Sequence, residues 1–189
     1  MKKYSEKETR ILNAASEMFT SRPFHKVLLS DVAGAASVGK GTLYLYFKNK
    51  EELYFAVLFR EFSILVEQLS EKIKQDNLNP AEKLTTIIKC LTKRLFVKAT
   101  NVELLGNVVS CPKSEEWKEK RVELWTLIES VIVQGVEQGY FEDSNPRLTA
   151  QYIPGFIRSV SIFPPENIDC ETIQKHACEF VLKSIKIEK

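Results

Sequence analysis

The chain has 189 residues, of which 44% are hydrophobic and 28% charged, a composition typical of a globular protein that buries a core. No apolar run approaches the ~20 residues that a helix needs to cross a bilayer, so we expect no membrane-spanning segment. The lysines at positions 2 and 3 resemble the start of a signal peptide, but Glu6, Glu8 and Arg10 interrupt the apolar stretch that should follow. We therefore expect a cytoplasmic protein.

Charge is distributed unevenly along the chain. Residues 1–50 contain nine Lys and Arg against four acids, a net charge of +5, which leaves −3 for residues 51–189 out of the total of +2. A basic N-terminal part followed by an acidic remainder is consistent with contact to phosphates, although scattered surface charge can produce the same asymmetry.

The N-terminal part is organised as a series of short helices. Ser5 and Glu8 form a capping box, and apolar residues then recur at helical spacing until Pro23 ends the helix. In the run Asp31–Leu53, an apolar helical face is interrupted around Val38 and is followed by the aromatic-rich segment GTLYLYF. This layout is typical of a helix-turn-helix, whose second helix can enter the DNA major groove.

The rest of the chain also has helical periodicity. Asn49 and Glu52 form a second capping pair that opens a long helix to about Ile73. Asn145 followed by Pro146 predicts another helix start, which continues to the loop at Phe163. Other helical segments are predicted at about 81–98, 102–109, 114–138 and 170–186. No strand pattern or repeat is present, so we expect an all-α fold of about nine helices.

The N-terminal residues match a known family pattern. The matching positions are Ile11, Leu12, Ala14, Ala15, Phe19, Asp31, Val32, Ala33, Ala36, Val38, Lys40–Tyr44, Tyr46, Phe47 and Lys50–Leu53. On these residues the segment 9–57 resembles the DNA-binding domain of the TetR family of bacterial transcriptional repressors. The resemblance implies a helix-turn-helix DNA-binding domain at 1–50 and a helical ligand-binding and dimerisation domain at 51–189.

Four features depart from the family pattern. Ser37 stands where the family usually has Gly, at a position that favours a left-handed backbone. Gly39 replaces the usual capping Ser, and Pro23 stands where a Gly is common. Val27 and Leu28 replace the usual Thr pair, which removes a hydroxyl contact to phosphate.

The resemblance implies that Gly39–Phe47 is the recognition helix. Lys40 is expected to reach a phosphate or a guanine edge, Leu45 a thymine methyl group, and Lys50 matches the family's phosphate-contacting lysine. Because the helix contains no Arg, Asn or Gln, we expect affinity mainly from phosphates and sequence preference partly from DNA shape. The complete expected DNA-binding set is Lys40, Gly41, Thr42, Tyr44, Leu45, Tyr46, Lys48 and Lys50.

The resemblance also implies a small-molecule effector and a homodimer. Aromatic residues expected to line the effector cavity indicate an apolar or aromatic ligand, although most residues of this kind belong to an ordinary core. They are Phe62, Phe96, Trp117, Trp125, Tyr152 and Phe156. The last two helices are apolar on more than one face, and their expected dimer residues are Ile153, Phe156, Ile157, Val160, Ile173, Ala177, Phe180 and Val181.

Catalytic and metal sites are not expected. His25 and His176 are the only histidines, no Glu-x-x-His pair is present, and the four cysteines have no metal-binding spacing. No phosphate-binding glycine loop or nucleophile elbow appears, so neither an enzyme nor a cofactor is expected. A ligand-responsive repressor of a palindromic operator is the main hypothesis. An all-helical protein-interaction module remains the alternative, and activation instead of repression stays open.

Overall fold

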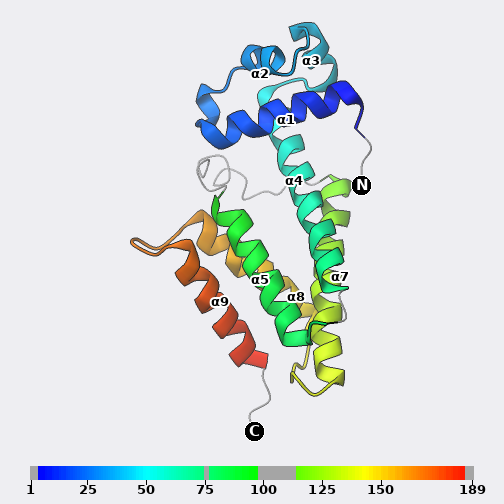
Figure 1. Ribbon diagram of the computed structural model, residues 1–189, viewed down its shortest axis with the longest axis vertical. Coiled ribbons are helices and arrows are strands. Elements are labelled where there is room, and N and C mark those ends of the chain that lie inside the picture. Colours follow the sequence, from blue (N-terminus) through cyan, green and yellow to red (C-terminus); the bar gives the residue numbers. More distant parts are fainter. Residues whose placement is uncertain (1–3, 75–76, 98–113, 186–189) are drawn as a thin grey trace. The chain divides into compact units, whose positions relative to one another are not determined.

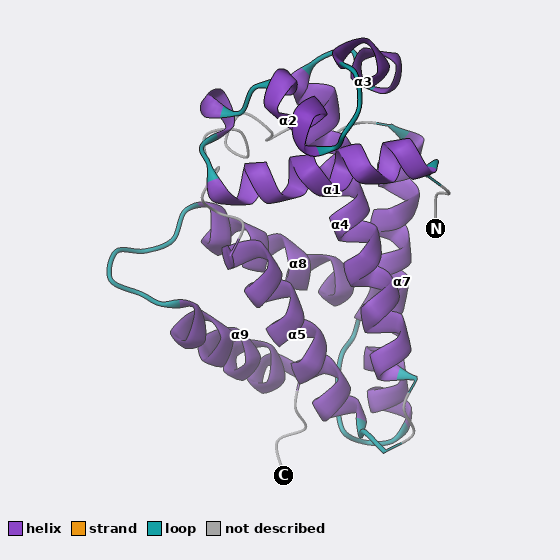
Figure 2. Cartoon of the chain, turned by 45° about the horizontal axis from the view of Figure 1, so that its top comes forward, coloured by secondary structure: helices purple, strands orange, loops and turns teal. Residues whose placement is uncertain are grey.

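The computed structural model describes residues 4–74, 77–97 and 114–185. Within these ranges the chain forms eight α-helices and one 3₁₀ turn, and no β-strand (Figure 2). The all-α expectation is therefore confirmed. The expected segment near 102–109 lies outside the described residues. None of the helices in the described part is long and apolar enough to span a membrane.

The chain divides into two compact units, and it passes from the first to the second within one helix, between Leu65 and Val66. The boundary implied by the family resemblance, at residue 50, lies earlier in the chain. The first turns of the fourth helix belong to the first unit because Leu53, Tyr54 and Val57 are buried in its core.

The first unit contains the N-terminal helices. Their bounds are α1 (Glu6–Ser21), η1 (Phe24–Lys26), α2 (Leu29–Ala35), α3 (Lys40–Tyr46) and the first part of α4 (Lys50–Ile73) (Figure 1). The capping box at α1 is present, since the Ser5 side chain accepts from the Glu8 N–H and Glu8 accepts from the Ser5 N–H. Apolar residues at helical spacing on α1 then pack with α2, α3 and α4 around Leu12, Leu43 and Leu53, which are fully buried. This core holds α2 and α3 in place.

The second unit is a bundle of α5 (Pro80–Val97), α7 (Glu115–Glu137), α8 (Pro146–Ile162) and α9 (Cys170–Ile185), together with the end of α4. α5 packs against α7, α8 and α9, and its core includes Ile87, Ile132 and Ile153, each at most 1% exposed. The Lys83 ammonium donates to Gln134 Oε1 at 3.2 Å and links α5 to α7. Asn145 caps α8 and Pro146 occupies its first turn, as the sequence predicts.

Candidate nucleic-acid interface

The turn between α2 and α3 is closed by backbone hydrogen bonds of the Schellman type. The Val38 N–H donates to the Ala33 carbonyl and the Ser37 N–H donates to the Gly34 carbonyl, both at 3.0 Å. Ser37 has φ 52°, which is the left-handed conformation that this motif requires at its terminal position. The left-handed backbone expected at this position is thus present, with Ser in place of Gly.

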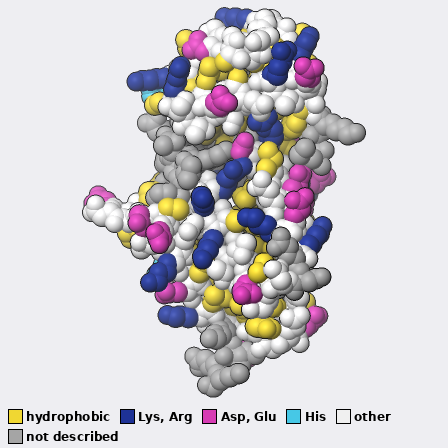
Figure 3. Space-filling model, in the orientation of Figure 1, with side chains coloured by type: hydrophobic (Ala, Val, Ile, Leu, Met, Phe, Trp, Pro, Cys, Tyr) yellow, Lys and Arg dark blue, Asp and Glu magenta, His cyan; other side chains and the backbone are white. Residues whose placement is uncertain are grey.

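One face of α3 is exposed to solvent, and it carries both polar and apolar side chains. Lys40, Gly41, Tyr44 and Leu45 are all exposed, and Leu45 is 85% exposed, the highest fraction among the exposed large hydrophobic residues. Lys and Arg side chains lie on the surface around this helix (Figure 3). A methyl group added at Gly41 would meet no atom within 4 Å, so a partner could approach the backbone closely there. The Leu45 side chain is not part of the hydrophobic core of the first unit.

Two residues of the expected DNA set, Thr42 and Tyr46, are only partly exposed, because α3 also packs onto the core of the first unit. Leu43 and Phe47 are buried in the core of the first unit, which fixes the rotation of α3 about its axis. Thr42 is half-buried. Tyr46 is also half-buried, and its hydroxyl accepts a hydrogen bond from Ser5 Oγ at 3.2 Å. Tyr46 therefore ties α3 to the start of α1.

The two lysines at the start of α4 differ in their surroundings. Lys48 is exposed, whereas the Lys50 ammonium donates to three carbonyl oxygens, those of Phe24 at 3.0 Å, Val27 at 3.1 Å and His25 at 3.4 Å. The same ammonium lies 4.5 Å from the centroid of the Phe24 ring. An ammonium has three N–H donors, so in this arrangement none is left for a phosphate.

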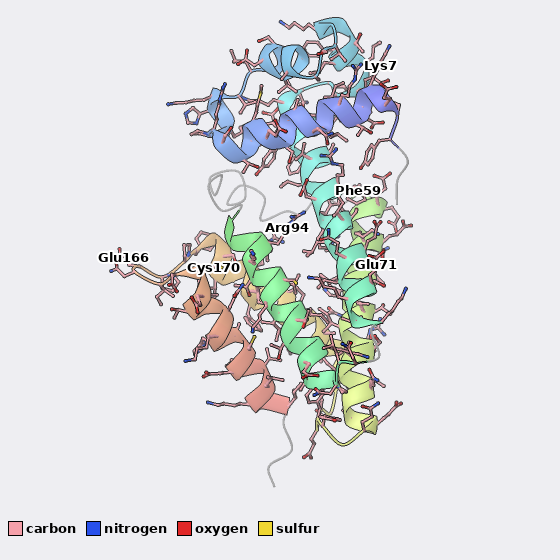
Figure 4. The ribbon with its side chains drawn as sticks, in the orientation of Figure 1. Lys7, Phe59, Glu71, Arg94, Glu166 and Cys170 are labelled. Atoms are coloured by element: carbon pink, nitrogen blue, oxygen red, sulfur yellow. The ribbon has the colours of Figure 1, made fainter. Side chains whose placement is uncertain are left out.

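Two exposed residues of the first unit lie outside the expected set. Leu28, the N-cap residue of α2, is 56% exposed and provides no side-chain cap. Lys7 projects from α1 on the side of α3 (Figure 4) and is exposed. Nothing in the local sequence around Lys7 indicated this position, because only the packing of α1 onto α3 brings the two together.

The residues expected to bind an effector occupy different environments. Phe62, Trp117, Trp125 and Phe156 are half-buried, while the side chain of Phe96 lies outside the described residues. Tyr152 is 63% exposed on α8, so it lies on the surface of the second unit and not in its interior.

Most of the expected dimer residues pack within their own chain. Ile153, Ile157, Ile173, Ala177 and Val181 are each at most 7% exposed. Val160 is half-buried. The apolar residues that do face outward on α8 and α9 include Tyr152 and Phe180, which is 58% exposed. The Phe180 ring stands edge-on to the Phe156 ring at 5.8 Å.

The described residues show no cluster of side chains that could bind a metal ion, since they contain no group of three His, Cys, Asp or Glu that could hold one. Cys90, Cys170 and Cys178 are free thiols, and Cys111 lies outside the described residues. Burial raises the pKa of the Cys178 thiol, so it stays protonated at neutral pH.

Comparison with known proteins agrees with this geometry. Residues 11–57 match the family described as "Bacterial regulatory proteins, tetR family", and residues 77–162 match "Tetracyclin repressor-like, C-terminal domain". The "Fatty acid metabolism regulator protein" of Bacillus subtilis is 25% identical over 170 residues, which cover 83% of this chain and 82% of that protein.

Solved structures share the fold over almost the whole chain. The fatty acid degradation regulator FadR from Bacillus halodurans has a TM-score of 0.69 at 24% identity and covers 96% of this chain and 97% of its own. FadR from Bacillus subtilis, solved in complex with stearoyl-CoA, has a TM-score of 0.69 at 21% identity, with 94% and 98% covered. With both of its domains matched, the chain belongs to the TetR family of bacterial transcriptional regulators.

Proposed function

We propose that the protein is a cytoplasmic, ligand-responsive repressor without catalytic activity, which binds a palindromic operator as a homodimer and releases it when an effector binds. The observation that carries the DNA-binding part is the outward face of α3, where Leu45 is 85% exposed and Lys40 and Tyr44 are exposed as well, with the exposed Lys48 just after the helix. Leucine at a major-groove surface suits the thymine methyl group, and the lysines suit phosphates.

The proposed DNA contacts come from the exposed residues. Lys40, Tyr44 and Lys48 would contact phosphates or base edges, Gly41 would allow close approach of the backbone, and Thr42 would be a secondary contact because it is half-buried. Lys7, which is exposed on the side of α3, would extend this surface. Tyr46 contributes by holding α3 against α1 through its bond with Ser5.

Selection of bound DNA from a random-sequence pool tests this interface. We expect an inverted repeat to be enriched by the wild-type protein and lost by the double variant Lys40→Met with Tyr44→Ala, since both residues are exposed and their removal leaves the core intact. The affinity for the selected repeat should fall steeply with salt. Absence of enrichment, or a salt-independent affinity, would favour the protein-interaction module instead.

We further propose that the homodimer forms through the outward aromatic face of α8 and α9. Tyr152, Phe156 and Phe180 support this, because two of them are more than half exposed and the third packs edge-on against Phe180. Helix-turn-helix regulators read two half-sites through such symmetric pairs. Light scattering should give a dimer mass for the wild type and a monomer mass for Phe180→Asp with Tyr152→Asp. Glu179→Lys, an exposed change on the same helix, serves as the control.

For the effector, we propose an acyl chain that carries an anionic head group, with stearoyl-CoA as the first compound to test. The relatives named for fatty acid regulation support an acyl chain. A half-buried arginine on α7 supports the anionic group. Lys118 and Lys120 pair with glutamates at 3.0 and 2.6 Å, whereas Arg121 Nη1 is buried and has no hydrogen-bond partner among the described residues. A ligand oxygen accepting from this N–H would remove the penalty of leaving it unpaired.

The two tryptophans of the chain make this test direct. Trp117 and Trp125 lie four residues before and four after Arg121, on the same side of α7, so their fluorescence reports on a ligand bound there. We expect stearoyl-CoA to change the fluorescence and to release the selected operator. Arg121→Met should weaken the binding, and Lys118→Met should leave it unchanged because Lys118 is exposed. Titrations with stearate and with free coenzyme A separate the contributions of chain and head group. Operator release that is identical in the Arg121→Met variant would refute the anionic contact.

A further inference from the structure

We propose that Lys50 is a positioning residue, which fastens the turn Phe24–Val27 to the first turn of α4 and makes no contact with DNA. This inference rests on the proposed DNA-binding function but assigns Lys50 a role opposite to the phosphate contact that the family resemblance implies. The evidence is the position of its ammonium, on which three backbone carbonyls and one aromatic ring converge.

The carbonyls belong to a short turn and the residue that follows it. The 3₁₀ turn η1 is only three residues long, and within it the Phe24 carbonyl accepts one hydrogen bond from the Val27 N–H, which leaves a second lone pair on that oxygen for the Lys50 ammonium. The carbonyl oxygens of Phe24, His25 and Val27 all lie within 3.4 Å of Lys50 Nζ. A charged donor forms stronger hydrogen bonds than a neutral one, and three such bonds use every N–H of the ammonium.

The aromatic contacts hold the same turn. The Phe24 ring lies 4.5 Å from the Lys50 ammonium. It also packs edge-on against Tyr54, with ring centroids 5.4 Å apart, and stacks on Phe19 with ring centroids 5.7 Å apart. Burial raises the pKa of Tyr54, so its hydroxyl is neutral and the cluster carries the single charge of Lys50. The turn is therefore clamped between α1 and α4.

Lys50 connects the turn Phe24–Val27 to the first turn of α4, which is held by hydrogen bonds of its own. The Glu52 N–H donates to Asn49 Oδ1, and the Lys48 N–H donates to Glu52 Oε2, both at 2.7 Å. Val27 is followed directly by Leu28 and α2, so a displacement of the α4 terminus would carry the start of α2 with it. Lys50 thus couples the helix that leads into the second unit to the helix-turn-helix.

Arginine and methionine substitutions at position 50 distinguish a lysine that contacts a DNA phosphate from one that positions the turn Phe24–Val27. A guanidinium binds phosphate at least as well as an ammonium, but its planar fork cannot direct donors at three carbonyls that converge on one point. If Lys50 is a positioning residue, Lys50→Arg and Lys50→Met should both weaken operator binding and lower the melting temperature by roughly 4–8 °C. The slope of log affinity against log salt concentration should stay at the wild-type value in both variants.

Lys48 supplies the matched control, since it is exposed and lies two residues away. We expect Lys48→Met to weaken operator binding and to reduce the salt slope by about 0.9, and Lys48→Arg to keep the salt slope of one phosphate contact, with no change of melting temperature in either variant. The inference is overturned if Lys50→Arg behaves like the wild type, or if Lys50→Met reduces the salt slope by the amount expected for one lost phosphate.

A measurement on the wild type avoids any dependence on how the variants fold. In a nitrogen–hydrogen NMR spectrum of lysine ammonium groups, the Lys50 signal should exchange with water more slowly than that of Lys48, in both the free and the operator-bound protein. Exchange as fast as that of Lys48 in the free protein would overturn the inference, as would coupling of the Lys50 nitrogen to a DNA phosphorus. If no operator can be selected at all, the proposed function fails, while this exchange measurement still tests the position of Lys50.

Discussion

Ser37 occupies a backbone conformation that suits glycine better, so Ser37→Gly should stabilise the protein. With φ 52°, the serine Cβ meets the steric penalty of the left-handed region, roughly 1–2 kcal/mol. Glycine avoids this penalty, but its greater freedom in the unfolded chain offsets about 0.4–1 kcal/mol of the gain. The two effects leave a net stabilisation of about 0.5–1 kcal/mol, because the two backbone hydrogen bonds of the turn are retained in the variant.

Urea denaturation followed by circular dichroism, together with thermal melting, measures this difference. For a chain of this length the melting temperature should rise by about 1–4 °C. Ala35→Gly is the matched control, because Ala35 is exposed and lies in α2 two residues before Ser37. The same glycine at that helical position should destabilise by about 1 kcal/mol. A Ser37→Gly variant that melts below the wild type, or as low as Ala35→Gly, would refute the reasoning.

Three further changes test other parts of the structure. Gly41→Ala should preserve or raise the melting temperature, since the added methyl group has open space in a helix, yet it should weaken operator binding in a mobility-shift assay if DNA approaches that backbone. Gly135→Ala should lower stability to urea by about 1–3 kcal/mol, because the added methyl group collides with the Phe141 ring. Hydrogen bonds to Thr172 lower the pKa of Asp169, so the carboxylate stabilises α9 above the ordinary pKa of 3.8 and loses this effect as the pH falls through its folded value. The stability difference between wild type and Asp169→Ala should accordingly be present at neutral pH and vanish in acid.

Local sequence signals predicted the helix ends well. Capping at Ser5, Asn49 and Asn145, and the left-handed turn at Ser37, each depend on residues within a few positions of one another, and the structure contains all four. Local sequence does not indicate the domain boundary, because α4 continues through it without a break. Only the packing of the helix decides which of its turns belong to which unit.

In the candidate site, too, some features follow from local sequence and others only from the packing of the helices. By itself the sequence determined that the chain is all-α, that a helix-turn-helix lies near its N-terminus, and which residues lie on the recognition helix, since periodicity and turn chemistry are local properties. Tertiary structure alone decided that Lys50 binds the carbonyls of residues 24–27 and that Ile153 and Val181 face their own core. Those outcomes depend on contacts between residues more than twenty positions apart, and such contacts follow from how the helices pack.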